Sequence, residues 1–203
     1  MASSPFRMPG GSFRRYLVLV FLVPLGYLFE VCVIPYLKIG GVSPNLLYVV
    51  IGIVTVAYGK LRAFWVGMIY GLLMQIMLQS VSYLNLALYS LTTLFCSFAF
   101  ADKPLKTIEY ERATNRSRKE LPPWLRTLLC AALNTLIYEV VNVAYLYIDG
   151  AELTFPHFFR AGLDVLLTAL LTIPVMFPIR RLIFGRRMNA PVMRTAPVVF
   201  SKH

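Results

Sequence analysis

The sequence predicts an all-α membrane protein: a compact bundle of six transmembrane helices with both termini in the cytoplasm. Three observations predict it, namely an apolar composition, six long apolar runs and the placement of the basic residues. Hydrophobic residues make up 58% of the chain and charged residues 14%, against about 45–50% and about 25% in soluble globular proteins. The mean hydropathy is +0.68. A soluble core of this size cannot bury so much apolar surface, whereas a lipid bilayer solvates it.

The six apolar runs are each candidates for one crossing of the membrane. A helix rises about 1.5 Å per residue and the hydrocarbon core is about 30 Å thick, so about 20 residues suffice. The second run is short by this standard, and it either begins earlier, near Ile39, or lies in a thin or protein-lined region. The expected spans are Tyr16–Tyr36, Pro44–Tyr58, Ala63–Gln79, Tyr83–Ala101, Leu125–Ile148 and Phe158–Ile183.

The basic residues orient this bundle. With the N-terminus in the cytoplasm, all of the 20 Lys and Arg residues except Lys38 and Arg160 fall on the cytoplasmic side, as the positive-inside rule requires. The expected organisation is a cytoplasmic arm (residues 1–15), a transmembrane domain (16–183) with a cytoplasmic loop (102–124), and a basic cytoplasmic tail (184–203). The net charge of +11 is therefore a topology signal, and no nucleic-acid partner is expected because no basic patch lies on a soluble fold.

The hairpin formed by the second and third spans carries a helix-packing pattern. A short basic turn, Gly59–Arg62, makes the two spans antiparallel neighbours. On the third span, small residues and amides recur at every fourth position and so share one helical face: Ala63, Gly67, Gly71, Gln75 and Gln79. Small residues let helices approach closely in lipid. We therefore predict that Gly67, Gly71 and Gln75 form a helix-packing or partner face.

Polar residues at membrane depth are the other candidates for function. Glu30, Glu139, Asn142 and Asp164 lie in three different spans, and the predicted topology places most such residues in the outer half of the bilayer. A charge in lipid costs at least about 2.5–3.5 kcal/mol on insertion scales, so these side chains should face the bundle interior or a partner, or be protonated. Two interpretations stay open for this cluster: hydrogen bonds that fix helix register, and a polar pocket or docking surface.

Residues for enzyme chemistry are scarce. The only histidines are His157, in an outer loop, and His203, the last residue. No His, Cys and carboxylate set has metal-ligand spacing, no glycine-rich phosphate loop is present, and no serine has a matching general base. We expect a protein that is not an enzyme and that carries no cofactor and no metal site.

Three sequence features together resemble the MreD family of bacterial rod shape-determining membrane proteins. They are the Pro-Asn entry in Ser43–Leu47, the short basic hairpin, and the run Gly67-x-x-x-Gly71-Leu72-Leu73-x-Gln75. The proline-containing end of the last span, Ile173–Leu182, is also similar to that family. The likeness covers roughly Tyr16 to Leu182. This chain departs from the family at Gln75, where relatives often carry Asp, and in its longer cytoplasmic loop and tail.

The resemblance implies a non-enzymatic component of the cell-elongation machinery in the bacterial cytoplasmic (inner) membrane. Its implied partners are an MreC-like single-pass membrane protein, a RodA-type glycosyltransferase, a penicillin-binding transpeptidase and actin-like MreB, besides membrane lipids. The implied fold is similar to that of the S-components of ECF vitamin transporters. An S-component that binds a vitamin or small solute in an outer pocket near Glu30, Gln75, Glu139 and Asp164 is therefore the alternative. Against it, Tyr16–Tyr36 lacks the Ala-x-x-x-Ala motif with which S-components commonly dock their partner.

Overall fold

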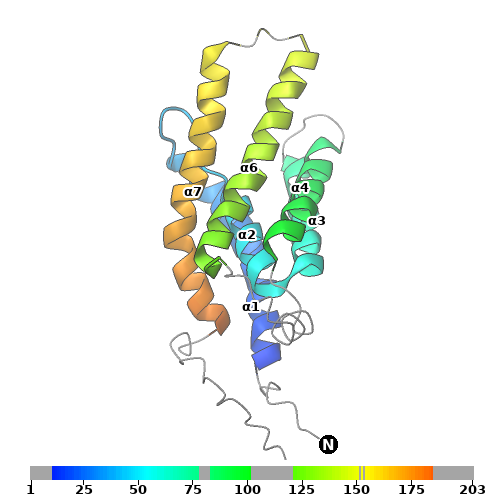
Figure 1. Cartoon of the computed structure of the whole chain (residues 1–203), viewed down its shortest axis with the longest axis vertical. Helices are drawn as coiled ribbons and strands as arrows, with labels where there is room; N and C mark the ends of the chain where they lie inside the picture. The colour runs from blue at the N-terminus through cyan, green and yellow to red at the C-terminus, as the bar shows by residue number, and fades with distance from the viewer. Residues whose placement is uncertain (1–10, 78–82, 102–120, 151, 153, 185–203) are drawn as a thin grey trace, which may run out of the picture.

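The computed structural model describes residues 11–77, 83–101, 121–150, 152 and 154–184. Within these ranges every regular element is a helix (Figure 1). The elements are α1 (Gly11–Cys32), the short 3-10 helix η1 (Ile34–Tyr36), α2 (Leu46–Tyr58), α3 (Lys60–Met77), α4 (Leu84–Phe100), α6 (Pro123–Ile148) and α7 (Phe155–Phe184). Most of the expected cytoplasmic loop and nearly all of the expected tail lie outside the described residues.

Each expected span coincides with one of the α-helices, with shifted boundaries. Helix α1 begins at Gly11, inside the expected arm, and α2 begins at Leu46 rather than near Ile39. The segment before α2 is instead a tight turn in which Ile39 and Val42 exchange backbone hydrogen bonds of 3.0 and 3.2 Å. Gly40 and Gly41 have positive φ in this turn, which a helix cannot contain. The second helix is therefore short, at 13 residues.

Three helices are long and apolar enough to cross a membrane: α1 together with η1, α6 and α7. Helices α2 and α4 are apolar but shorter, and α3, whose first turn carries Lys60 and Arg62, is not among the candidates. These lengths and compositions indicate a membrane protein.

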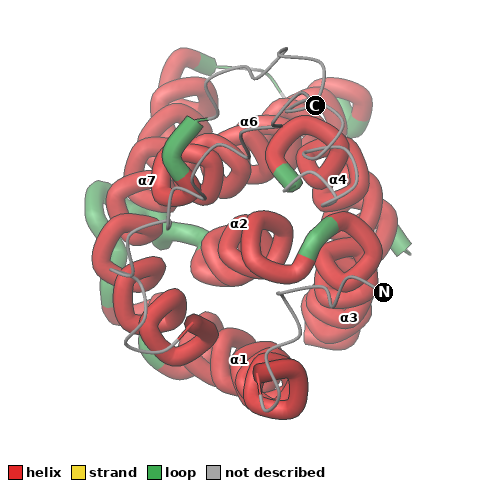
Figure 2. The backbone as a smooth tube through the Cα atoms, turned by 60° about the horizontal axis from the view of Figure 1, so that its bottom comes forward, coloured by secondary structure: helices red, strands yellow, loops and turns green. Residues whose placement is uncertain are grey.

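Helix α2 is the centre of the bundle. Figure 2 shows it surrounded by the other helices, and it contacts α1, α3, α4, α6 and α7. Every residue from Leu46 to Val56 is buried, as expected for a helix that is apolar on all sides. Gly52 permits the closest crossing, because a Cβ there would lie 3.1 Å from the Thr127 carbonyl oxygen and 3.3 Å from the Ala131 nitrogen of α6.

Aromatic side chains hold the two basic residues of the α2–α3 turn at one end of the molecule. The Lys60 ammonium lies 4.4 Å from the ring centroid of Phe98, at the end of α4. The Arg62 guanidinium lies 4.7 Å from the Tyr16 ring centroid and donates a hydrogen bond to the Tyr16 hydroxyl, near the start of α1. The starts of α1 and α3 and the end of α4 therefore meet at the same end, and α7 also ends there (Figure 1).

Helices α6 and α7 form the longest pair and pack side by side. They contain 26 and 30 residues, so each is about 39 Å long or longer, more than a hydrocarbon core of about 30 Å. In Figure 1 their far ends extend beyond the α3–α4 pair. Pro174 and Pro178 lie within α7, which continues through both.

Candidate functional site

The expected glycine face is used inside the chain, where it joins α3 to α4. A Cβ at Gly67 would lie 2.6 Å from the Thr93 hydroxyl and 2.9 Å from the Tyr89 carbonyl oxygen. A Cβ at Gly71 would lie 2.8 Å from the Cα of Leu86. The two glycines therefore lie where α4 packs closely against α3, and α4 covers the surface that a partner would need.

Gln75 also joins α3 to α4, but through a hydrogen bond rather than through close packing. Its side-chain oxygen accepts a hydrogen bond of 3.2 Å from the backbone N–H of Asn85, in the first turn of α4. The first N–H groups of a helix have no partner within the helix, so the amide satisfies one of them. Gln75 is therefore a capping residue between α3 and α4.

Glu30 of α1 caps the start of the central helix. Its Oε2 accepts a 2.8 Å hydrogen bond from the backbone N–H of Leu46, the first residue of α2. A carboxyl group is favourable there because the helix N-terminus carries unsatisfied N–H groups and a partial positive charge. This contact explains how a residue expected to be costly in lipid is accommodated.

Asn45 joins three helices at the same point. Its Oδ1 accepts from the Tyr48 backbone N–H at 3.3 Å, which makes it the N-cap of α2. Its Nδ2 donates to the Tyr89 hydroxyl of α4 at 3.0 Å. Its backbone N–H donates to Oγ1 of Thr168 on α7 at 2.9 Å. The Pro-Asn entry of the second span is thus a tertiary junction as well as a helix start.

Thr168 extends this network to Asp164, one turn away on α7. The Thr168 hydroxyl donates to Oδ1 of Asp164 at 3.2 Å, and both residues are buried. Asp164 also interacts electrostatically with Glu30, and its carboxyl is within side-chain hydrogen-bonding reach of Glu139 on α6. Three carboxyl groups from three helices therefore gather beside the N-terminus of α2.

Three tyrosines line the inner side of this network. The rings of Tyr48 and Tyr89 stack with centroids 4.6 Å apart and planes 9° apart. Tyr138 of α6 meets these two rings with centroid distances of 5.6 and 5.7 Å, and Asn142 lies one helical turn further along α6, near its hydroxyl. Aromatic contacts of this kind add about 0.5–1.5 kcal/mol to the burial of the rings.

We call these residues the polar cluster: Glu30, Asn45, Tyr89, Tyr138, Glu139, Asn142, Asp164 and Thr168. The structure brings together all four members expected from the sequence, Glu30, Glu139, Asn142 and Asp164. Sequence reasoning missed Asn45 and Thr168 as partners of these carboxyls, and it missed the tyrosines. The Pro-Asn motif was the only available signal, since Thr and Tyr are ordinary residues in transmembrane helices.

The cluster has an excess of acid. In the described part of the chain, no Lys or Arg is paired with Glu30, Glu139 or Asp164. Neighbouring carboxyl groups at low dielectric do not all ionise without compensation; they share a proton or face a cation. Among these residues no group of three His, Cys, Asp or Glu side chains is arranged to hold a metal ion.

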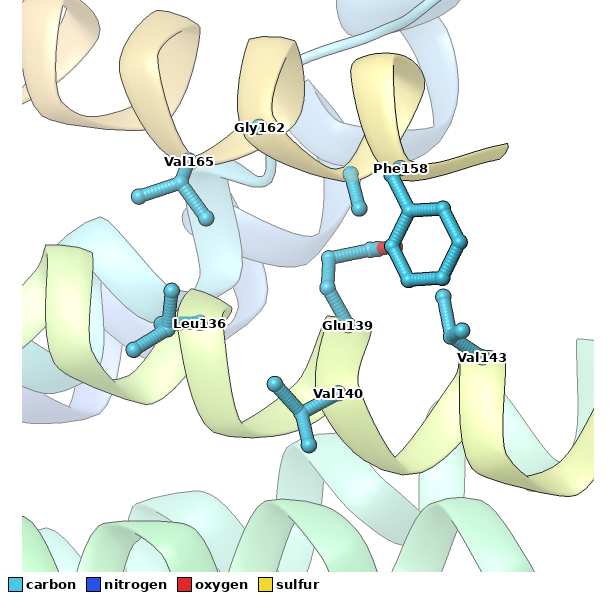
Figure 3. Close-up of a pocket in the computed structure, with 8 residues that line it drawn as sticks. Leu136, Glu139, Val140, Val143, Phe158, Gly162 and Val165 are labelled. Atoms are coloured by element: carbon cyan, nitrogen blue, oxygen red, sulfur yellow. The ribbon is translucent and has the colours of Figure 1, made fainter. Parts of the chain in front are cut away.

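Glu139 also faces outward, into an apolar groove between α6 and α7. The close-up in Figure 3 shows its side chain projecting from α6 toward Phe158 of α7. The groove has a volume of about 390 Å³. Its lining is Leu136, Glu139, Val140 and Val143 from α6, and Phe158, Ala161, Gly162 and Val165 from α7. Glu139 thus connects the buried polar cluster to the outer surface of the bundle.

Comparisons with protein-family models, with curated proteins and with solved structures returned no match to this chain.

Proposed function

We propose that this chain is an MreD-like, non-enzymatic component of the bacterial cell-elongation machinery in the cytoplasmic membrane. In this proposal all six helices cross the bilayer on the plan of an ECF S-component, with both termini in the cytoplasm. The chain binds an MreC-like single-pass membrane protein and helps to assemble a RodA-type glycosyltransferase, a penicillin-binding transpeptidase and MreB.

The observation that carries the proposal is the unit that runs from Ser43 to Gln75. Its family-like residues are the ones with structural roles: Asn45 caps α2 and reaches α4 and α7, Gly67 and Gly71 bring α4 against α3, and Gln75 caps α4. This supports the family resemblance on which the proposed function rests.

The basic turn between α2 and α3 supports the proposed orientation of the bundle in the membrane. Lys60 and Arg62 lie on aromatic rings at the end of the bundle where α1 begins and α7 ends. Basic residues concentrate on the cytoplasmic side of a membrane. The polar cluster is at the other end of α2, and so in the outer half of the bilayer.

The test is co-purification from the native membrane. The full chain, tagged at its N-terminus and expressed in the bacterium that encodes it, is extracted in mild detergent and its companions are identified by mass spectrometry. We expect an MreC-like single-pass protein in a fixed ratio to the chain. Recovery of an energy-coupling module with its ATPases, and no MreC-like protein, would refute the proposal.

One observation favours the alternative, a solute-binding S-component. Glu30, Glu139 and Asp164, three of the four residues expected to line an outer pocket, do lie together. The fourth, Gln75, caps α4. Denaturing the purified protein and analysing the released small molecules decides between the two functions: a vitamin retained in stoichiometric amount would support the alternative.

A further inference from the structure

The seam between α6 and α7 has a shape that fits a helix. In the outer half, Leu136, Val140 and Val143 of α6 lie at positions i, i+4 and i+7 along one wall of the groove. Phe158, Gly162 and Val165 of α7 follow the same spacing along the other wall. Rows of this kind are the ridges between which a third helix packs.

Small residues leave room at the α7 wall. Ala161 and Gly162 both line the groove, and a Cβ added at Gly162 would meet nothing within 4 Å. Small residues at a helix surface let a second backbone approach closely in lipid. Gly67 and Gly71 are already covered by α4, whereas Gly162 is exposed.

A second hollow, of about 420 Å³, lies toward the cytoplasmic end of the same two helices. Trp124 and Leu128 of α6 line it together with Thr172, Ile173, Met176 and Phe177 of α7. A small solute would occupy only one of the two hollows. A transmembrane helix that follows the seam would reach both.

Charge complementarity indicates that a helix in this seam carries a basic side chain. Glu139 is the one ionisable residue lining the outer groove, it faces Asp164, and neither is paired with a basic residue of the described chain. A Lys or Arg side chain entering the groove would offset this excess of acid.

We propose that the α6–α7 seam is the docking site for a transmembrane helix of a partner protein, with a Lys or Arg in its outer half placed against Glu139. The inference rests on the proposed function in one respect: the partner helix is that of the MreC-like protein. It gives that protein a defined place on the bundle, on the side of α6 and α7 that no other described helix covers.

Site-directed photo-crosslinking in native membranes tests the placement. A benzophenone amino acid is incorporated at Val140 and, separately, at Ile173, one position for each hollow. Leu91 and Phe95 of α4 serve as matched controls, because they are apolar and have exposed fractions of 50% and 66% against 60% and 44% at the test positions. We expect the two seam positions, and not the controls, to capture the same membrane-spanning peptide of the MreC-like protein, and that peptide to contain Lys or Arg.

The crosslinks separate this inference from the proposed function. Capture of the MreC-like protein at α4 but not at the seam would overturn the docking site and keep the function. Capture, at both seam positions, of a basic transmembrane segment from an identified protein outside the elongation machinery would keep the docking site and overturn the function. Absence of any captured polypeptide at the seam overturns the docking site.

Charge reversal tests the role of Glu139. We expect Glu139→Lys to reduce the co-purified partner at least 10-fold and Glu139→Gln to reduce it less, because the amide still accepts a hydrogen bond. Glu152→Lys, in the exposed outer loop, is the matched control and should leave the yield unchanged. Thermal unfolding of the purified chain shows whether Glu139→Lys weakens folding. If it does, a compensating substitution in the partner is the second test. Changing the basic residue in the captured peptide to Glu should restore binding to Glu139→Lys, and failure to restore it with a folded chain would contradict the pairing.

Discussion

Asn45 is the residue on which three helices converge. It caps α2, its side chain donates to the Tyr89 hydroxyl of α4, and its backbone N–H donates to the Thr168 hydroxyl oxygen of α7. Beside it, Glu30 caps the same helix from α1. The central helix is therefore held by hydrogen bonds at its N-terminus and by the ring contacts of Tyr48, because most of its other side chains are apolar.

The first prediction separates the capping role of Asn45 from its role between helices. Asn45→Ala should lower the free energy of unfolding by about 1–2 kcal/mol for the lost cap, with a further loss of about 1 kcal/mol for the bond to Tyr89. Asn45→Ser keeps a capping oxygen, so it should retain the stability of the cap and lose only the contribution of the bond to Tyr89. Thermal or denaturant unfolding in detergent measures both, and equal losses for the two variants would contradict the assignment.

The second prediction concerns the charge of Glu30. Its structural role needs an acceptor for the Leu46 N–H, and an amide oxygen supplies one. Glu30→Gln should therefore leave unfolding nearly unchanged, while Glu30→Ala should cost about 1–3 kcal/mol because a buried N–H loses its partner. If Glu30→Gln is as damaging as Glu30→Ala in the same assay, the negative charge itself is required.

At the level of helices, each contact depends on whether glycines or larger side chains lie at the interface. Helices α3 and α4 meet through Gly67 and Gly71, α2 and α6 meet through Gly52, and α6 and α7 leave an open seam. The first two contacts are closed by glycines against backbone atoms. The third has side chains on both walls and space between them, so it is the one with capacity for another helix.

Gly71→Leu tests the closed contact between α3 and α4. The new side chain would start 2.8 Å from the Cα of Leu86, so the helices must separate, at a cost of about 1–3 kcal/mol. Membrane insertion should persist because the apolar length of α3 is unchanged. Gly162→Leu is the matched control, since nothing lies within 4 Å of a Cβ there. Similar melting temperatures for the two purified variants would show that Gly71 is not a tight contact.

The elements were more predictable from sequence than the cluster. Continuous apolar runs identify helices directly, and Gly67 and Gly71 were recognisable because their spacing places them on one face. Glu30, Glu139 and Asp164 stood out because carboxyls are costly in lipid. Thr168 and Tyr138 did not, because their roles depend on which helices become neighbours. Gln75 shares the face of Gly67 and Gly71 in the sequence pattern, but its bond to Asn85 depends on how the chain returns into α4.

At the scale of the whole molecule, the number of crossings decides which side each surface faces. Three helices satisfy the length and hydropathy of a span by themselves. The short α2 is enclosed by protein on all sides, and a helix inside a bundle need not match the bilayer by its own length. In the proposed six-span topology, the polar cluster and the outer groove lie toward one side of the membrane and the basic turn lies toward the other.

Reporter fusions distinguish six crossings from three. With six, a C-terminal fusion lies on the same side as the N-terminus; with three, it lies on the opposite side. We expect a periplasmic alkaline phosphatase reporter to be inactive at the C-terminus and after Phe100, and active after Gly150. A green fluorescent protein at the same positions should give the inverse pattern. An active phosphatase at the C-terminus would contradict the six-span bundle.

Depletion of this chain in the bacterium that encodes it tests the proposed role in cell elongation. Cell shape and incorporation of a fluorescent D-amino acid into the side wall are followed by microscopy, with and without a plasmid copy of the chain. We expect depleted cells to become round and to lose ordered side-wall synthesis, and we expect the wild-type copy to restore both. Depleted cells that stay rod-shaped but require a supplied vitamin for growth would contradict it and would favour the solute-binding alternative.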